Sequence, residues 1–416
     1  MDVKIDFLGM PNKVGRSAYL ITGSKSILLD YGVDLDRIPK FPEPVDVKHL
    51  DLFVISHSHL DHMGAAPMLY VSGNVKALTT RPSIDVSDLL IRDFMKLSGE
   101  YLLFEYIDFV SLRRNVELLG YEEELRLDGA SITLYDAGHI PGSAQVLVSL
   151  DGKNILYTGD INTYETMLQK PAHMDFDVEL DAVIMESTYG DSKHPDRRTQ
   201  ERRFVELAEE AIEEGGTVLV PAFAVARSQE ILLILEKYGF KYDVVMDGMA
   251  LEVTKIFLSH PDYLKDPDML ERAFSSVRKV YRWRDRKKLV RERVLIIAPA
   301  GMLGGGAAVF YLNKLIKNPK NRIFLVGYQA PGTPGRSLLE ESESEERRDM
   351  ADVLYMRFSA HADVDGLFKF ASKLQGDPKI FVVHGDRDAR RNIGELVEDK
   401  LGFKVIYPST KESYII

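Results

Sequence analysis

Three histidines and an aspartate lie within six positions of the segment FVISHSHLDHMGAAP, residues 53–67. They follow an apolar run that is typical of a buried strand, and they are His57, His59, Asp61 and His62. Imidazole and carboxylate groups are ligands that suit Zn²⁺. A single histidine beside a strand is more often a hydrogen-bonded structural residue, but packing alone does not select four polar side chains at the end of an apolar strand. The spacing therefore predicts one short segment that offers ligands to two adjacent cations.

Further apolar runs end in residues that can bind a metal ion or carry a proton. These residues are Asp30, His139, Asp160, Glu186 and His384. Short apolar runs alternate with polar helical stretches along the chain, as in an α/β protein, and in such folds the loops at the carboxyl ends of strands carry the chemistry. Runs that end this way in distant parts of the sequence suggest that their side chains share one centre.

The elements that must position this centre are expected in two domains, because 416 residues exceed what one hydrophobic core usually supports. Between Glu186 and His361 the sequence has its own alternation of strands and helices, with helices expected over 197–214 and 226–239, and this favours an inserted α/β domain. The acidic stretch 338–349 is expected to be an exposed loop.

Composition and charge narrow the class of protein. Hydrophobic residues make up 45% of the chain and charged residues 28%, as in an ordinary soluble globular protein. No apolar run approaches the ~18 residues that span a bilayer, and the start, MDVKIDFLGM, lacks the pattern of a secretion signal. We therefore expect a cytoplasmic protein without a membrane partner. The absence of cysteine excludes disulfides and thiolate zinc sites. The net charge of -11 argues against indiscriminate nucleic-acid binding but is compatible with a local basic groove.

A basic segment and a glycine cluster could contact a polyanion. Residues 277–293 contain nine lysines or arginines, two acidic residues and the only tryptophan, a composition that can follow the phosphates and stack the bases of a single strand. We single out Arg282 and Arg284 here, although a solvated helix is the simpler explanation for most of the segment. Gly304 and Gly305 precede an expected helix whose free N–H groups could hold a phosphate, while tight packing would also explain them.

Taken in order, the same segments resemble the motifs of the metallo-β-lactamase superfamily and, more narrowly, of its β-CASP branch of nucleases. HSHLDH corresponds to the pattern H-x-H-x-D-H, and it is followed by GHIPGSA, TGD, ESTYG, FSAHAD and VVHGD. Three further segments, PAFAVARSQE, APAGML and GYQAPGTPGR, resemble parts of the nuclease subunit of the cleavage and polyadenylation specificity factor and its archaeal, ribonuclease J-like relatives. The resemblance extends through almost the whole chain.

This resemblance implies an αββα metallo-β-lactamase sandwich, built from the two ends of the chain, with an inserted α/β β-CASP domain. The expected boundaries are 1–188 and 356–416 for the two parts of the sandwich and 189–355 for the insertion. The resemblance also implies two Zn²⁺ ions per chain. One would be held by His57, His59 and His139, the other by Asp61, His62 and His384, with Asp160 bridging the two.

Two residues outside the ligand set are expected to act in catalysis. A leaving oxygen of RNA needs a proton, which His361 is suited to donate while Glu186 orients its imidazole. We count Asp61 and Asp160 with them as catalytic residues.

Three other residues have supporting roles in this interpretation. Asp30 could accept a hydrogen bond from a ligand histidine and fix its tautomer, although a plain turn residue explains it equally well. Arg227 and Arg336 lie in segments that carry the resemblance and are candidate phosphate contacts.

We therefore expect a zinc-dependent ribonuclease that hydrolyses phosphodiester bonds of single-stranded RNA in 3′-end processing, maturation or decay. We expect the RNA to enter a cleft between the two domains. The protein could also form a homodimer. We favour endonucleolytic over 5′-to-3′ exonucleolytic cleavage, because the acidic Asp363 would repel a 5′-phosphate docked near His361. The alternatives are a non-catalytic RNA-binding or scaffold subunit and a small-molecule hydrolase of the same superfamily. The intact ligand set speaks against the first, and the second leaves Glu186, His361 and the inserted domain unexplained.

Overall fold

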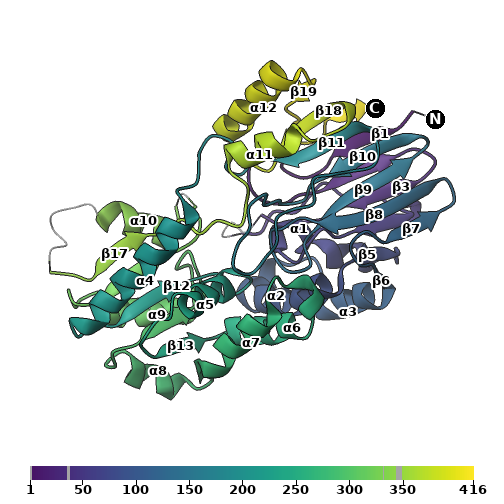
Figure 1. Cartoon of the computed structure of the whole chain (residues 1–416). Coiled ribbons are helices and arrows are strands. Elements are labelled where there is room, and N and C mark those ends of the chain that lie inside the picture. Colours follow the sequence, from purple (N-terminus) through teal and green to yellow (C-terminus); the bar gives the residue numbers. More distant parts are fainter. Residues whose placement is uncertain (1, 35–37, 331, 343–348) are drawn as a thin grey trace. The chain divides into compact units, whose positions relative to one another are not determined.

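The computed structural model describes residues 2–34, 38–330, 332–342 and 349–416 (Figure 1). Its contacts separate two compact units. Unit 1 comprises the residues up to Glu165 together with Gln169–Lys193 and Ala360–Ile416. Unit 2 comprises Thr166–Leu168 and His194–Ser359. Among the described residues, none of the helices combines the length and the apolar character needed to cross a lipid bilayer.

Unit 1 contains two sheets, each with seven strands among the described residues. The first has the order β20 (Ser413–Ile415), β1 (Lys4–Phe7), β2 (Tyr19–Thr22), β3 (Ser26–Leu29), β4 (Leu52–Val54), β5 (Ala77–Thr79) and β6 (Val116–Leu118). The second has the order β19 (Val405–Ile406), β18 (Gly376–Val383), β11 (Leu180–Glu186), β10 (Lys153–Tyr157), β9 (Ala144–Leu150), β8 (Ala130–Asp136) and β7 (Glu124–Leu127). Both sheets join strands from opposite ends of the chain.

The two sheets pack face to face over one apolar core. Side chains from both sheets, such as Ile21 and Val54 of the first and Val146 and Ile184 of the second, share this core and are fully buried. The outer face of the first sheet is covered by α1 (Leu60–Met63), α2 (Arg81–Ser98), α3 (Tyr106–Asn115) and the short helices η1 (Val47–His49), η2 (Ala66–Tyr70) and η3 (Gly99–Tyr101). The outer face of the second is covered by α11 (Val364–Ala371) and α12 (Arg387–Leu401). The expected αββα sandwich is confirmed.

Unit 2 is built on one parallel sheet with helices, which confirms the expected α/β insertion. The sheet has the order β14 (Arg278–Val280), β13 (Val244–Asp247), β15 (Leu295–Ala298), β12 (Val218–Pro221), β16 (Arg322–Leu325) and β17 (Asp352–Tyr355), and each of these strands runs parallel to its neighbours. The connecting helices are α4 (Arg197–Glu213), α5 (Arg227–Lys237), α6 (Ala250–Leu258), η4 (Pro261–Tyr263), α7 (Pro267–Ser276), α8 (Trp283–Leu289), α9 (Gly306–Leu315) and α10 (Pro334–Ser342). Parallel strands require such crossovers, so the strand-helix alternation of the sequence already contains this topology.

The expectation of an exposed loop over 338–349 is wrong at its start. Residues 338–342 form the last part of helix α10. Leu338 is buried and belongs to the apolar core of unit 2, and this burial explains why the acidic segment begins as a helix. Residues 343–348 of the same expectation lie outside the described residues.

Candidate metal centre

The candidate site residues of unit 1 lie where strands end. β3 and β4 pair in parallel, and so do β10, β11 and β18, so the carboxyl ends within each set share one sheet edge. Asp30 follows β3, His57 follows the strand region of β4, Asp160 follows β10, Glu186 ends β11 and His384 follows β18. The parallel direction of the strands thus brings residues from the whole length of the sequence to one place.

Close backbone approach completes this arrangement. A Cβ atom on Gly32, just beyond β3, would lie 1.7 Å from the carbonyl oxygen of Asp61 and 2.7 Å from the nitrogen of His62, so a side chain there would push the HSHLDH segment away. His384 adopts a φ of 50°, a left-handed conformation that is uncommon for residues other than glycine. The backbone around the centre is therefore shaped for these side chains.

Three imidazoles and one carboxylate form a first group of candidate ligands. His59 Nδ1 lies 3.1 Å from His57 Nε2 and 3.2 Å from His139 Nε2. Asp160 Oδ2 lies 3.6 Å from His57 Nε2 and 3.7 Å from His139 Nε2. Ligand atoms about 2.1 Å from one tetrahedral zinc ion are about 3.4 Å apart, so these spacings fit a single cation.

A second group lies on the other side of Asp160. Asp61 Oδ2 lies 3.3 Å from His384 Nε2 and 3.9 Å from His62 Nε2. Asp160 Oδ1 lies 3.3 Å from His62 Nε2 and 3.3 Å from His384 Nδ1. The two oxygens of one carboxylate thus face two different sets of nitrogen atoms.

Two atoms of this centre suggest directly that a cation belongs there. His62 Nε2 and Asp160 Oδ1 are buried, and although they lie 3.3 Å apart, neither forms a hydrogen bond of acceptable geometry among the described residues. Buried polar atoms are costly unless they are paired or coordinate a metal ion. The residues present therefore fit metal binding, and this fit rests on the donor atoms themselves.

A buried carboxylate fixes one of the candidate ligands from behind. Asp30 Oδ2 accepts hydrogen bonds from His62 Nδ1 at 2.8 Å, from the Tyr157 hydroxyl at 2.7 Å and from Ser56 Oγ at 2.7 Å, and Oδ1 accepts the Ser56 N–H at 2.7 Å. With its Nδ1–H donated to Asp30, the ring of His62 presents Nε2 to the centre. Asp30 also follows β3 with a φ of 55°, so it is a turn residue as well as a partner of His62.

His57 and His139 are also held by hydrogen-bond partners on the side away from Asp160. His57 Nδ1 lies 3.0 Å from Ser56 Oγ, which itself donates to Asp30. His139 Nδ1 donates to the carbonyl oxygen of Ala360 at 2.8 Å. In both rings the Nε2 atom is left facing Asp160. The sequence interpretation missed Ser56 and Tyr157, although a polar residue at the end of an otherwise apolar strand was a signal for each.

Burial and mutual charge set the protonation of the centre. Burial lowers the pKa of His57 and His139 well below the usual value, and that of His59 to about 4. Burial also opposes charge on His62, but the carboxylates of Asp160 and Asp61 outweigh it and raise the pKa of His62 well above the usual value. The same negative potential that keeps a proton on His62 would also attract a divalent cation to the centre.

His361 lies beside the first group and is paired with Glu186. Its Nδ1 lies 2.9 Å from Glu186 Oε1, and its Nε2 lies 4.0 Å from Asp160 Oδ2. Burial alone would lower the pKa of His361, but the charges of Glu186 and Asp160 raise it to about 9. Its side chain keeps 20% of its surface exposed, so the ring can be reached from solvent.

Glu186 could also join a metal group, because its carboxylate lies near donor atoms of Asp160 and His384. Its oxygens are already used by other donors. Oε1 accepts from Ile161 N at 2.8 Å and Oε2 accepts from Thr188 N at 3.1 Å, in addition to the contact with His361. Because its oxygens already accept these hydrogen bonds, Glu186 is better explained as a partner of His361 than as a metal ligand.

The acidic Asp363 does not support the expected bias against exonucleolytic cleavage. Its side chain is 4% exposed and caps α11 by accepting the N–H of Gly366 at 2.9 Å, and it also accepts the hydroxyl of Tyr164 at 2.8 Å. The burial and the hydrogen bonds of this carboxylate identify it as the N-cap of α11.

The remaining predicted residues all belong to unit 2. Arg227 begins α5 and is partly buried, and Arg336 in α10 pairs with Glu340 at 2.6 Å. Gly304 and Gly305 precede α9, and an added Cβ on either would meet no atom within 4 Å, so packing does not explain them. The basic segment 277–293 is not one helix, because it contains β14 and the short helix α8.

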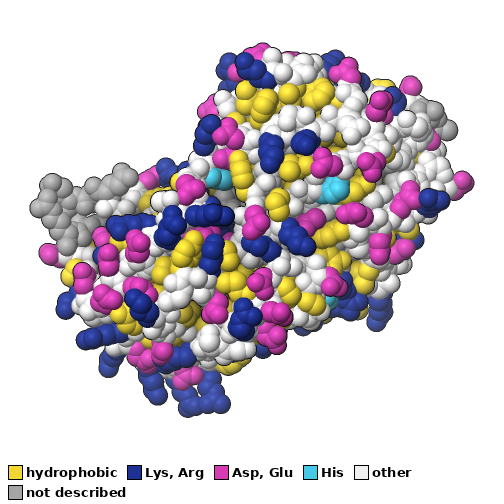
Figure 2. All heavy atoms as spheres, in the orientation of Figure 1, with side chains coloured by type: hydrophobic (Ala, Val, Ile, Leu, Met, Phe, Trp, Pro, Cys, Tyr) yellow, Lys and Arg dark blue, Asp and Glu magenta, His cyan; other side chains and the backbone are white. Residues whose placement is uncertain are grey.

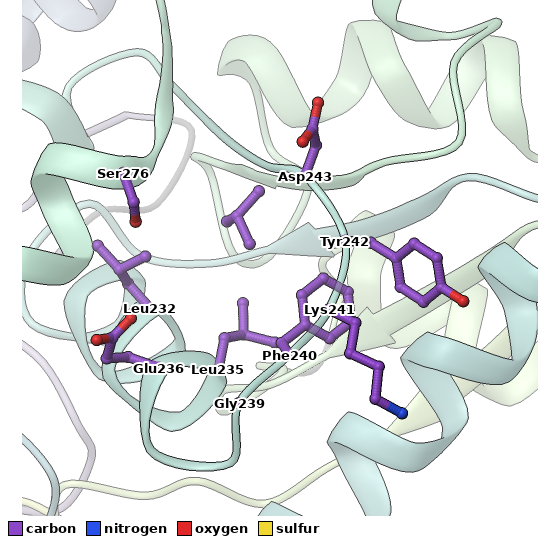
Figure 3. Close-up of a pocket in the computed structure, with 10 residues that line it drawn as sticks. Leu232, Leu235, Glu236, Gly239, Phe240, Lys241, Tyr242, Asp243 and Ser276 are labelled. Atoms are coloured by element: carbon purple, nitrogen blue, oxygen red, sulfur yellow. The ribbon is translucent and has the colours of Figure 1, made fainter.

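Unit 2 also contains a cavity of about 290 Å³ (Figure 3). It is lined by side chains that include Leu232, Leu235, Phe240 and Tyr242, together with Lys241 and Asp243. None of the predicted site residues lines it, and the donor atoms that could hold a metal ion all belong to unit 1. The cavity is therefore separate from the chemistry described above.

Comparison with known families agrees with this architecture. Residues 11–189 match the metallo-beta-lactamase superfamily, residues 228–338 match the Beta-Casp domain, and residues 350–408 match the Zn-dependent metallo-hydrolase RNA specificity domain. The chain belongs to the β-CASP branch of the metallo-β-lactamase superfamily.

Several curated archaeal proteins are similar to the chain. The chain is 40% identical to the "RNase aCSPSF2" of Saccharolobus solfataricus, over 98% of this chain and 84% of that protein. It is 35% identical to the "Probable RNase MJ4" of Methanocaldococcus jannaschii over 99% of both chains. It is 32% identical to the "Transcription termination factor FttA" of Pyrococcus horikoshii, over 99% of this chain and 70% of that protein.

A solved structure shares the fold. The crystal structure of a protein of unknown function from Enterococcus faecalis superposes over the full length of both chains with a TM-score of 0.65. The two sequences are 14% identical, so this likeness concerns the fold alone.

Proposed function

We propose that the chain is a metal-dependent ribonuclease that holds two zinc ions and hydrolyses phosphodiester bonds of single-stranded RNA. The observation that carries this proposal is the position of Asp160, whose two oxygens face two separate sets of donors. The proposed ligands are His57, His59 and His139 for one ion and Asp61, His62 and His384 for the other, with Asp160 shared between them.

RNA is the proposed substrate because a matching domain and two relatives are named for RNA. The chain matches an RNA specificity domain, and two relatives that align over nearly all of this chain are named as ribonucleases. A role in RNA 3′-end processing, maturation or decay, and a place in the cytoplasm, belong to the same proposal. Formation of a homodimer also stays a prediction.

When bound, a pair of zinc ions lowers the pKa of water and neutralises charge on a phosphate. The residues of the chain supply the rest of the reaction. As the oxygen of water forms its bond to phosphorus, the bond from phosphorus to the 3′-oxygen breaks and that oxygen needs a proton. His361 donates it from Nε2, since its Nδ1 is held by Glu186. The products are a 5′-phosphate and a 3′-hydroxyl.

Glu186 keeps His361 in position for this step. Its carboxylate is fixed by the N–H groups of Ile161 and Thr188 and is fully buried. A buried carboxylate fixed in this way stabilises the charged imidazole and orients its ring. Glu186 is therefore a positioning residue, and His361 is the group that meets the leaving oxygen.

Phosphate contacts outside the centre are proposed for unit 2. Arg336 pairs with Glu340, one turn further along α10, and an exposed pair of this kind is weak enough to be exchanged for a phosphate. Gly304 and Gly305 leave open space at the start of α9, so a phosphate could approach its N–H groups. Arg227 is proposed as a further contact because it begins α5 and lies in PAFAVARSQE, one of the segments that carry the family resemblance.

Product mapping tests the proposal. Metal-loaded protein is incubated with internally labelled and with end-labelled RNA, and the new ends are identified. Internal cuts that leave 5′-phosphates support an endonuclease, whereas stepwise release of nucleotides from the 5′ end would establish the exonuclease instead. RNA binding without any cleavage would favour the scaffold subunit. A preparation of Asp160→Ala serves as the control for contaminating nucleases.

A further inference from the structure

The basic segment of unit 2 presents two exposed aromatic rings. Tyr281 is 63% exposed and Trp283, the first residue of α8, is 56% exposed. Figure 2 shows lysine and arginine side chains gathered along the lower edge of its view, where Figure 1 places α8. Neighbouring aromatic side chains that are exposed together amid positive charge form a patch of the kind that marks a binding surface.

The tryptophan is held in place although it is exposed. Its ring lies 4.6 Å from that of Phe310 on α9, and the guanidinium carbon of Arg286 lies 5.1 Å from its centre. Arg286 is itself fixed by the fully buried Asp247, through bonds of 2.7 and 2.8 Å. A ring that is positioned before its ligand arrives loses little conformational entropy on binding.

The cations of the segment divide into two kinds. Arg278 and Arg286 form ion pairs with acidic residues and so serve the structure of unit 2. Six others are exposed and form no ion pair with any described residue, and four of these, Arg282, Arg284, Lys287 and Lys288, lie within five residues of Trp283. These four flank Trp283 in sequence and supply positive charge that is not already neutralised.

We propose that these residues form a second binding site for single-stranded RNA, in which bases stack on Tyr281 and Trp283 while the four exposed cations contact phosphates. We call this set the α8 platform. The inference rests on the proposed function, because that function makes RNA the substrate, but the platform lies outside the metal centre. Its role is to bind RNA through residues other than the candidate metal ligands and His361.

RNA fits this surface better than an acidic protein does. An acidic peptide would use the cations but has no flat groups to cover two exposed aromatic rings. Bases do, because every base has a stacking face, and each stacked base contributes about 5- to 100-fold in affinity. The chain as a whole has a net charge of -11, so this basic patch is a local site on a protein that is otherwise acidic.

The sole tryptophan of the chain reports on this site directly. Metal-loaded protein is mixed in a stopped-flow instrument with an oligoadenylate of about eight nucleotides, a length within the range that such grooves cover. Stacking should quench the fluorescence of Trp283 early in the reaction, and the same samples are then analysed for cleavage. An abasic oligomer of equal length should quench much less.

Variants separate stacking from charge. Trp283→Ala should weaken RNA binding about 5- to 100-fold, whereas Trp283→Phe should recover most of that loss. Replacement of Arg282, Arg284 and Lys287 together by alanine should flatten the salt dependence of binding by about 2, since each phosphate contact on a single strand contributes about 0.7. The matched control replaces Lys314, Lys317 and Lys320, which are exposed elsewhere in unit 2, and should leave the slope unchanged.

Three results would overturn the platform. One is cleavage without quenching, which would leave the ribonuclease intact and remove only this inference. Another is equal quenching by the abasic oligomer, and the third is equal quenching by polyglutamate, which would identify a surface for acidic proteins. Quenching by RNA without any cleavage would support the platform and count against the proposed function.

Discussion

The metal centre of unit 1 and the α8 platform of unit 2 both contain clusters of charged residues, but these residues differ in their burial and in how firmly they are held. In the centre, His57, His62 and Asp160 are at most 2% exposed, and the histidine rings are fixed by partners behind them. On the platform, Trp283 alone is firmly held, while the cations around it are exposed. Chemistry needs groups that are preorganised away from water, whereas attraction for a flexible polyanion tolerates mobile charges. The contrast predicts large, specific losses in the centre and graded, salt-dependent losses on the platform.

His361 offers the sharpest way to break this contrast. We expect His361→Ala to lower the cleavage rate by ~10² to 10⁴, because a general acid is lost, while the metal content and RNA affinity stay those of the wild type. Single-turnover cleavage, elemental analysis and a binding titration measure the three quantities. His49→Ala, at an exposed histidine paired with Asp46, is the matched control and should leave all three unchanged.

A substrate with a better leaving group makes the role of His361 specific. An RNA with a bridging sulfur in place of the scissile 3′-oxygen needs little protonation of the leaving atom, so it should restore much of the rate of His361→Ala. If this substrate is impaired as severely as ordinary RNA, or if metal is lost from the variant, then His361 is not the general acid.

Removing the hydrogen bonds behind the ligands should have a smaller effect. Ser56→Ala and Tyr157→Phe each remove one hydroxyl that donates to Asp30, so we expect the affinity for metal to fall by about 10- to 100-fold. Competition with a chelator measures it. Ser87→Ala and Tyr70→Phe remove buried hydroxyls that bond elsewhere in unit 1, and they are the controls. Equal weakening by the controls would mean that the effect is general loosening of the fold.

The smallest effect concerns Asp136, whose carboxyl is not one of the candidate metal ligands. Burial raises the pKa of Asp136 from 3.8 to about 6. The folded protein therefore binds this proton more tightly than the unfolded chain between about pH 4 and 6, and its free energy of unfolding falls as the pH rises through that window. Asp136→Asn keeps the oxygen that accepts the Gly138 N–H and removes the charge.

At pH 8 we expect Asp136→Asn to be more stable than the wild type by about 1 to 2 kcal/mol, a value discounted for the partial exposure of the side chain. At pH 4 the two should be nearly equally stable. Denaturant unfolding at several pH values measures the difference, with the exposed Asp377→Asn as a control. A difference that does not change with pH would contradict the assigned cause.

Much of the fold and of the centre could be predicted because both depend on local sequence. Apolar strands that end in His57, Asp160 or His384 needed only a parallel sheet to bring their side chains together, and the alternation of strands and helices already indicated that sheet. The hydroxyls of Ser56 and Tyr157 could not be assigned, because their common partner Asp30 is distant in sequence and is met only in the folded chain.

The basic segment shows the opposite limit. Its nine cations looked alike in the sequence, and nothing there indicated that Arg286 is bound to the buried Asp247 and so belongs to the structure. The helix over 338–342 was missed for a similar reason, because the acidic residues that follow obscured the packing of Leu338 and Leu339 against the core. Tertiary partners decided both cases, and a pattern of charge alone does not contain them.

The central claim is that Asp160 joins two cation sites, and metal stoichiometry tests it most directly. Native mass spectrometry with elemental analysis is applied to the zinc-reconstituted wild type, to Asp160→Ala and to the surface control Asp377→Ala. We predict two zinc ions per chain in the wild type and the control, and a loss of bound zinc in Asp160→Ala because each of its oxygens faces one site. A wild type that binds no more than one zinc ion, or an Asp160→Ala variant that retains two with unchanged affinity, would contradict the account.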